Sequence, residues 1–297
     1  MVRRPEIVHV RTNLGLVPGV ERLGEVLLGE GLAEGIGARA GAVVEAPAYS
    51  GERVHPSRLL NAEAMGEVAL RQALVVADVI EGGRLPVVLG GDDSVIFGSL
   101  LALRRRGAYG LVFLDAHTDF YPPGDSPTGQ ASDSEVYLAF GNGAEVIANL
   151  DGARPLVEPR AAVLIGRRDS DEWRDTGAAL SATDALVVSL EEVRESGVEG
   201  VARRALARLD DAGVEGFLLH IDADVLDDAL MPAVDYRLPG GLDRREFGAL
   251  VGALLADERV VCVDVTIYNP GLDPGGEAGR DLAGCLIDAF AQGRAAS

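Results

Sequence analysis

The stretch Gly110-Leu-Val-Phe-Leu-Asp115-Ala-His117-Thr-Asp119 decides the fold of this chain. Its first half is an apolar run without a turn former, which is typical of a β-strand buried on both faces, here over residues 110–115. If the backbone stays extended, Asp115, His117 and Asp119 point to the same side, and a slight bend lets them converge. Two carboxylates and one imidazole suit a borderline-hard divalent cation such as Mn²⁺. The stretch therefore predicts a strand that brings metal ligands to its carboxyl end.

A second stretch, Gly216-Phe-Leu-Leu-His-Ile-Asp222-Ala-Asp224, repeats this pattern. An apolar run again ends in carboxylates spaced by one residue, and Asp227 and Asp228 follow closely. Carboxylates gathered within a few ångströms repel one another by roughly several kcal/mol unless they are protonated or neutralised. A pair of divalent cations is therefore the expected reason for collecting them.

The rest of the chain alternates strand-like and helical segments, which indicates a parallel sheet. Amphipathic helices are expected over residues 61–81, 198–212 and 282–295. The eight expected strands span residues 7–11, 42–45, 86–89, 110–115, 161–165, 185–190, 216–222 and 260–266. They could form a barrel or an open sheet, and periodicity does not choose between these. Both folds place function at the carboxyl ends of the strands, where the acidic clusters lie.

Composition and charge exclude several classes of protein. The 297 residues are 47% apolar and contain no Ser-, Gly- or Pro-rich linker, so one domain over residues 1–297 is expected. The formal charge of −20 argues against binding to nucleic acid or to an anionic membrane. Cys262 and Cys285 are too few for a disulfide framework, and both are expected to be buried. The first residues lack the apolar region of a secretory signal and no run reaches the ~20 residues of a membrane span, so a cytoplasmic protein is expected.

Long or chemically dense loops follow several of the expected strands. In the first, Gly90-Gly91-Asp92-Asp93-Ser94, the simplest interpretation is that Asp92 or Ser94 caps the following helix. The proline-rich loop 120–133 is either a pocket wall or an ordinary surface crossover. His220 points to the same face of the strand as Asp222 but lies farther from the strand end. This position favours packing, or a hydrogen bond to a metal ligand, over direct metal binding. Further loops of this kind span residues 166–171, 227–242 and 266–274.

Four of these motifs, in this order, resemble the arginase/agmatinase family, the ureohydrolases. They are Gly-Gly-Asp-Asp-Ser at 90–94, Asp-Ala-His-Thr-Asp at 115–119, His-Ile-Asp-Ala-Asp-Val-Leu-Asp at 220–227, and Asn-Pro at 269–270. The resemblance implies a three-layer α/β/α sandwich around an eight-stranded, mainly parallel sheet. It also implies two Mn²⁺ ions per chain, hydrolysis of a C–N bond in a linear amidine or guanidine, and a homo-oligomer, trimeric or hexameric.

The resemblance also assigns roles to individual residues. Asp115 and Asp222 would bridge the two metal ions. His117 and Asp224 would complete the first ion, and Asp93 and Asp119 the second. Asp119 would also act in catalysis, by accepting a proton from the attacking water and passing it to the leaving amine. The small-molecule substrate would contact Asp171 and the loop residues Thr128 and Gln130.

Three departures from the family pattern bear on the substrate. Asp93 stands where the family usually has a histidine, and its added negative charge should move the activity optimum to alkaline pH unless Asp93 is neutralised or turned away. Ser132 replaces a proton-shuttling histidine. The window Thr266-Ile267-Tyr268 lacks the glutamate that binds a guanidinium group in the family. Without this carboxylate, a guanidinium substrate should lose roughly several kcal/mol of binding free energy.

Ser132 and Thr266 are therefore expected to face a substrate other than arginine. A catalytically silent binding or assembly protein with the same fold is the alternative. The enzyme is favoured, because a chain without catalysis has no reason to hold five carboxylates together against their repulsion.

Overall fold

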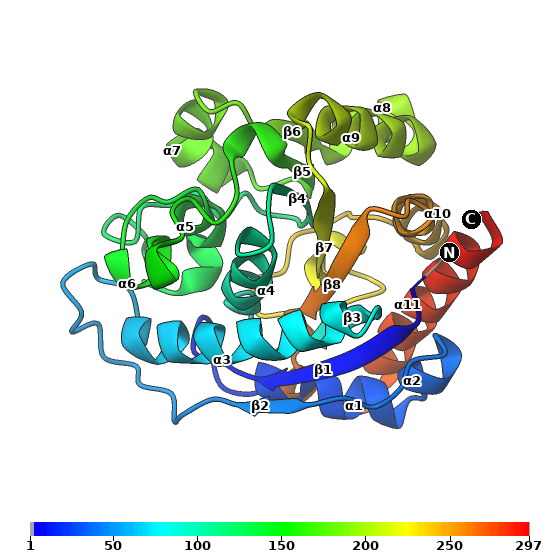
Figure 1. The fold of residues 1–297 in the computed structure, drawn as a ribbon, viewed down its shortest axis with the longest axis horizontal. Helices are drawn as coiled ribbons and strands as arrows, with labels where there is room; N and C mark the ends of the chain where they lie inside the picture. The colour runs from blue at the N-terminus through cyan, green and yellow to red at the C-terminus, as the bar shows by residue number, and fades with distance from the viewer. Residues whose placement is uncertain (1–2, 297) are drawn as a thin grey trace.

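The computed structural model describes residues 3–296, and its centre is one open sheet of eight parallel strands in the order β2-β1-β3-β8-β7-β4-β5-β6 (Figure 1). Every strand expected from the sequence is present, with ends that shift by no more than two residues. The sheet is open, with β2 and β6 at its edges, which excludes the barrel. The strands are β1 (Pro5–Arg11), β2 (Val43–Glu45), β3 (Leu85–Leu89), β4 (Tyr109–Leu114), β5 (Ala162–Arg167), β6 (Leu186–Ser189), β7 (Gly216–Asp222) and β8 (Val260–Thr266).

Helices cover both faces of the sheet, so the fold is the expected α/β/α sandwich. Along β4, Leu111 and Phe113 pack into one apolar core, and the alternate residues Val112 and Leu114 pack into the other. α3 to α7 cover the first face, and α1, α2 and α8 to α11 cover the second (Figure 1). The helices are α1 (Leu23–Gly29), α2 (Leu32–Gly35), α3 (Ala62–Glu81), α4 (Val95–Arg104), α5 (Glu135–Ala139), α6 (Glu145–Ala148), α7 (Ser170–Ser181), α8 (Leu190–Ser196), α9 (Val198–Ala212), α10 (Arg244–Leu255) and α11 (Glu277–Ala296).

The helices expected at 61–81 and 198–212 are α3 and α9. The one expected at 282–295 is α11, which begins five residues earlier, at Glu277. The carboxylate of Asp273 accepts a hydrogen bond from the amide of Gly279 and so fixes the first turn of α11. Among the helices of residues 3–296, none is both long and apolar enough to cross a membrane.

The first loop departs from the expected capping. Ser94 occupies the N-cap position of α4, but its side chain makes no capping hydrogen bond. The carboxylate of Asp92 instead accepts the Ser94 amide (2.9 Å) and the Thr12 hydroxyl (3.1 Å), and so joins the loop to the end of β1. A Cβ atom at Gly91 would lie 1.9 Å from the Thr12 carbonyl oxygen, so only glycine permits this close approach.

Three central strands end side by side and position the site. In the register of the sheet, Leu114 of β4 pairs with Ile221 of β7, and Asp222 pairs with Thr266 of β8. The residues that follow β4 are not extended, because Asp119 has the left-handed backbone angle φ 47°. Asp115, His117 and Asp119 therefore do not share a face through strand alternation. The chain bends at Ala116 and His117, as expected, and the left-handed backbone of Asp119 adds a change of direction that was not expected. His117 and Asp119 both come close to Asp115, but in separate groups of ligands.

Candidate metal centre

Two groups of potential metal ligands lie at the ends of β4 and β7. The first is Asp115, His117 and Asp224, and the second is Asp115, Asp119 and Glu135. Within each group, ligand atoms from all three residues lie within 4.8 Å of one another. Asp115 belongs to both groups. The arrangement therefore has the form of two adjacent cation sites that share one carboxylate.

Backbone amides orient the carboxylates. The amide of His117 donates to Asp115 Oδ1 (2.6 Å), the amide of Ala116 to Asp224 Oδ1 (3.0 Å), and the amide of Asp224 to Asp222 Oδ1 (2.6 Å). The second oxygen of Asp115, Oδ2, is buried and has no hydrogen-bond partner among the described residues. A buried carboxylate oxygen without a donor is unfavourable, and a metal ion would satisfy it.

Burial and mutual repulsion disfavour negative charge on most of this cluster. Burial, with the Asp224 charge second, raises the pKa of Asp115 to about 7. Burial and neighbouring carboxylates also hold the pKa values of Asp119 and Asp222 well above their usual range. Asp224 differs. Burial raises its pKa, but His117, whose Nδ1 lies 2.9 Å from Asp224 Oδ2, together with the Ala116 amide and Arg168, outweighs burial and lowers the pKa. The donor set is chemically that of a divalent-cation site.

Asp93, the sixth expected ligand, lies beside a histidine. Its Oδ1 is 3.2 Å from His220 Nε2, while His220 Nδ1 is 3.5 Å from Asp264 Oδ2. Burial alone would lower the pKa of His220, but the hydrogen bonds with Asp264 and Asp93 outweigh it and raise the pKa to about 9. The ring also stacks on Phe113, with the ring centroids 5.0 Å apart. In residues 3–296, neither Asp93 nor Asp222 is part of the two groups of three described above.

Glu135 was not predicted from the sequence. It is the first residue of α5, and its side chain is completely buried. Burial, followed by the charges of Asp93 and Asp115, holds its pKa well above the usual range. A five-residue helix carries no periodic signal, so only its place directly after the loop 120–133 could have drawn attention to it.

The expected substrate residues of the loop 120–133 lie close to one another. Thr128 donates from its hydroxyl to Asp133 Oδ2 at 2.5 Å. Gln130 accepts a hydrogen bond from the Tyr236 hydroxyl at 2.9 Å, which connects this loop with the one that follows β7. The hydroxyl oxygen of Ser132 is buried and has no hydrogen-bond partner in the described part of the chain.

The other two expected substrate residues lie in different surroundings. Thr266 is completely buried, and its hydroxyl oxygen is 3.4 Å from His220 Nε2. Asp171 lies in the first turn of α7, where its side chain is 88% exposed and pairs with Arg174. It is therefore separate from the buried cluster. The buried carboxylate of the loop 166–171 is instead Asp169. It is 3% exposed and accepts a hydrogen bond from the Thr118 hydroxyl.

Two arginines, one for each loop, form hydrogen bonds to the two long loops beside the site. Arg168 donates to the carbonyl oxygens of Asp224 (2.8 Å), Leu238 (3.1 Å) and Pro239 (3.2 Å), which holds the loop after β7. The guanidinium of Arg53 donates to the carbonyl oxygens of Pro123 and Ser126 on the loop 120–133, and to that of Arg58 in its own segment. The sequence does not reveal the role of either arginine. Most of the carbonyl oxygens that they bind belong to residues 56 to 73 positions away along the chain.

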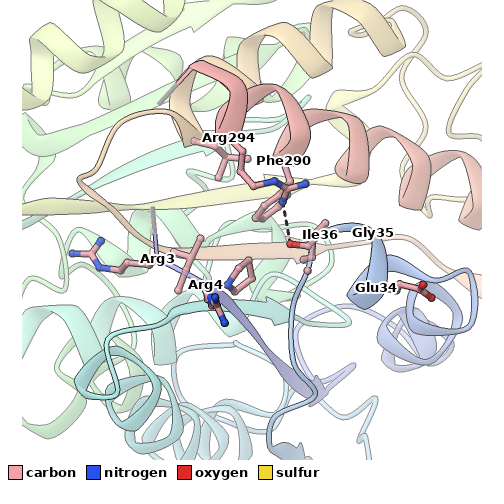
Figure 2. Close-up of a pocket in the computed structure, with 11 residues that line it drawn as sticks. Arg3, Arg4, Glu34, Gly35, Ile36, Phe290 and Arg294 are labelled. Atoms are coloured by element: carbon pink, nitrogen blue, oxygen red, sulfur yellow. Dashed lines mark hydrogen bonds between the residues drawn. The ribbon is translucent and has the colours of Figure 1, made fainter. Parts of the chain in front are cut away.

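A cavity of about 360 Å³ lies away from this cluster (Figure 2). Arg3 and Leu85 line it near the starts of β1 and β3, so it opens at the amino-terminal edge of the parallel sheet. Figure 2 shows Arg294 of α11 on its wall, donating to the carbonyl oxygen of Ile36. None of the residues that line it is an expected ligand, so its size does not make it the functional site.

Most of the chain is similar in sequence and in structure to proteins of one family. A sequence model described as the Arginase family matches residues 49–291. An arginase from Brevibacillus brevis is 31% identical over 203 residues, which cover 68% of this chain and 67% of that protein. An arginase from Bacillus caldovelox is 29% identical over 231 residues, 76% of each chain. The solved structure of the Bacillus caldovelox arginase superimposes with a TM-score of 0.86 at 26% identity, covering 97% of this chain and 98% of that one.

Proposed function

Because the chain belongs to the arginase family, we propose that it is a hydrolase that uses two Mn²⁺ ions to cleave a C–N bond. The proposed substrate is a linear amidine or guanidine-like small molecule other than arginine. The position of Asp115 is the observation that carries this proposal. This single carboxylate takes part in both groups of ligands, and its buried Oδ2 has no other partner among the described residues.

The proposed ligands are those expected from the sequence. Asp115 and Asp222 would bridge the ions, and each ion would be completed by a pair of further residues. When bound, the two ions supply Lewis-acid activation of a water molecule for attack on an sp² carbon. The pairs are His117 with Asp224, and Asp93 with Asp119.

Asp119 is the proposed proton carrier. Its carboxylate is 5% exposed and belongs to one of the two ligand groups, which supports this role, because it would lie close to a water held between the proposed ions. Burial and its charged neighbours raise its pKa, which suits a group that accepts a proton and then returns it to a leaving amine. Ser132 cannot perform this transfer, since a hydroxyl does not titrate near neutral pH.

The proposed exclusion of arginine rests on the residues after β8. Ile267 is buried and apolar, and the hydroxyl of Tyr268 is already engaged in a hydrogen bond to Asp273 Oδ2 at 2.8 Å. Neither residue offers a free carboxylate that could pair with a guanidinium. A substrate with a less basic head group, or one recognised through Thr128 and Gln130, suits this surface better.

The test is a substrate screen on protein loaded with Mn²⁺. Linear amidines, guanidines and ureas are incubated with the protein, and released urea or ammonia is measured. Turnover of at least one such compound, lost in Asp119→Asn, is expected, with arginine hydrolysed much more slowly. A protein that binds Mn²⁺ and turns over none of them would favour the alternative, a silent binding or assembly protein. The trimeric or hexameric state stays a prediction that light scattering can check.

A further inference from the structure

Glu135 is a buried carboxylate for which the described residues provide no ion-pair partner. It is 0% exposed, and neither Oε1 nor Oε2 has a hydrogen-bond partner in the part of the chain that the structure describes. Isolated burial of an ionised carboxylate is so unfavourable that such groups are normally paired, protonated or bound to a metal. No counter-charge or donor is present among the described residues, so burial favours the protonated form of Glu135 in the metal-free protein, and a metal ion can replace that proton.

A second buried glutamate nearby shows the ordinary arrangement. Glu172 of α7 is 9% exposed, but its Oε1 accepts the amide of Phe120 at 2.9 Å. Its Oε2 accepts the amide of Thr118 at 3.4 Å. Glu172 therefore holds the turn after β4 in place through backbone hydrogen bonds. Glu135 makes no bond of this kind, so it does not have the same structural role.

The backbone directs Glu135 toward the metal centre. The amides of Val136 and Tyr137, at the start of α5, both donate to the carbonyl oxygen of Asp119, at 3.2 and 3.4 Å. These bonds fix the start of α5 against the segment that carries Asp119. As a result, a carboxylate oxygen of Glu135 lies within 4.8 Å of ligand atoms of both Asp115 and Asp119.

Asp93 is less available at the same end of the sheet. Its Oδ1 lies 3.2 Å from His220 Nε2, and both side chains are buried, with exposures of 2% and 0%. A histidine that holds this oxygen competes with a metal ion for it. The carboxylates of Asp115, Asp119 and Glu135 converge on one another. Among the described residues, Asp115 is the one of these three with a histidine beside it, since His117 Nδ1 lies 3.5 Å from Asp115 Oδ1.

We propose that Glu135 is a ligand of the metal ion held by Asp115 and Asp119. This rests on the proposed function, because it needs the two-ion centre to exist. It adds to that centre a ligand from α5, an element outside the sheet. Formation of the site would then depend on correct docking of α5 and of the loop 120–133 before it.

The test compares metal binding by the wild type, Glu135→Gln and the matched control Glu172→Gln. Each protein is stripped with a chelator and titrated with Mn²⁺. Free Mn²⁺ is followed by electron paramagnetic resonance, and bound metal is counted by elemental analysis. Wild type and Glu172→Gln are expected to bind two ions. In Glu135→Gln, one of the two is expected to be lost or to bind at least about tenfold more weakly.

Two outcomes separate this inference from the proposed function. Two ions in Glu135→Gln with the wild-type affinities would overturn the role of Glu135 and leave the proposed function intact. No bound Mn²⁺ in the wild type would overturn both. Melting temperatures without metal check folding: Glu135→Gln is expected to equal or exceed the wild type, because it no longer buries an ionisable group that lacks a hydrogen-bond partner among the described residues. Glu135→Asp, which keeps the carboxylate, is expected to retain more of the second ion than Glu135→Gln.

Discussion

At the scale of single residues, the pair of Asp93 and His220 changes what the unusual aspartate means. The sequence alone suggests that Asp93 adds one negative charge to the centre. In the structure, His220 lies 3.2 Å from it and has a pKa raised to about 9, so a buried imidazolium faces that charge at neutral pH. The alkaline activity optimum stays a prediction, and His220 is the group that would neutralise Asp93 and remove the reason for it.

His220→Gln should lower the free energy of unfolding of the chelated protein by about 3 kcal/mol at pH 7, since it leaves two buried carboxylates without their cation. The control is His55→Gln, because the His55 side chain is 24% exposed and its pair with Glu63 lies near the surface. This control should change the free energy by less than about 1 kcal/mol. Urea denaturation measures both values.

The same pair predicts a pH dependence. The folded-state pKa of His220 lies above the ordinary value of 6.5, so its contribution is complete below about pH 6.5 and is lost as the pH rises through about 9. Wild type should therefore lose stability over this window relative to His220→Gln. Parallel pH profiles for the two proteins would contradict a charged His220.

At the scale of elements, the arginine that fastens the loop after β7 should matter more than arginines on the surface. Arg168→Ala removes hydrogen bonds to four carbonyl oxygens, those of Asp224, Leu226, Leu238 and Pro239, and should lower the free energy of unfolding by about 2–3 kcal/mol. Arg174→Ala removes only an exposed pair with Asp171 and should cost about 0.5 kcal/mol or less. Equal urea midpoints for the two variants would contradict the role of Arg168.

The elements themselves could be predicted from the sequence to a large extent. Buried parallel strands are continuous apolar runs, and all eight were located because such runs end at turn residues or carboxylates. The bend after β4 was expected, but the left-handed backbone of Asp119 was not, since its carbonyl oxygen is held by amides of α5, a contact between distant parts of the chain. Glu135 and Arg168 were missed for a related reason. Their roles come from tertiary contacts, which leave no period in the sequence.

At the scale of the whole molecule, the metal-free protein is expected to become less stable as the pH rises. Asp115 has a folded-state pKa of about 7, above its ordinary value of 3.8, and Asp222 is raised as well. The stability that these groups contribute is present below about pH 4 and is lost as the pH rises through their folded-state pKa values.

Mn²⁺ should reverse this loss. A cation replaces protons on the carboxylates, so the increase in melting temperature on adding Mn²⁺ should be larger at pH 8 than at pH 5. At about one hundred times the dissociation constant, each ion adds about 2.7 kcal/mol. Thermal unfolding with Mn²⁺ or with a chelator, at both pH values, measures the effect. An equal or larger increase at pH 5 would contradict a site built from these carboxylates.

The central claim is that ligands from the ends of β4 and β7 hold a pair of divalent cations. The most direct measurement is an anomalous difference map at the manganese absorption edge, from crystals grown with Mn²⁺. We predict two peaks per chain, one among Asp115, His117 and Asp224 and one beside Asp115, Asp119 and Glu135. A map with no peak there, from crystals at saturating Mn²⁺, would contradict the account.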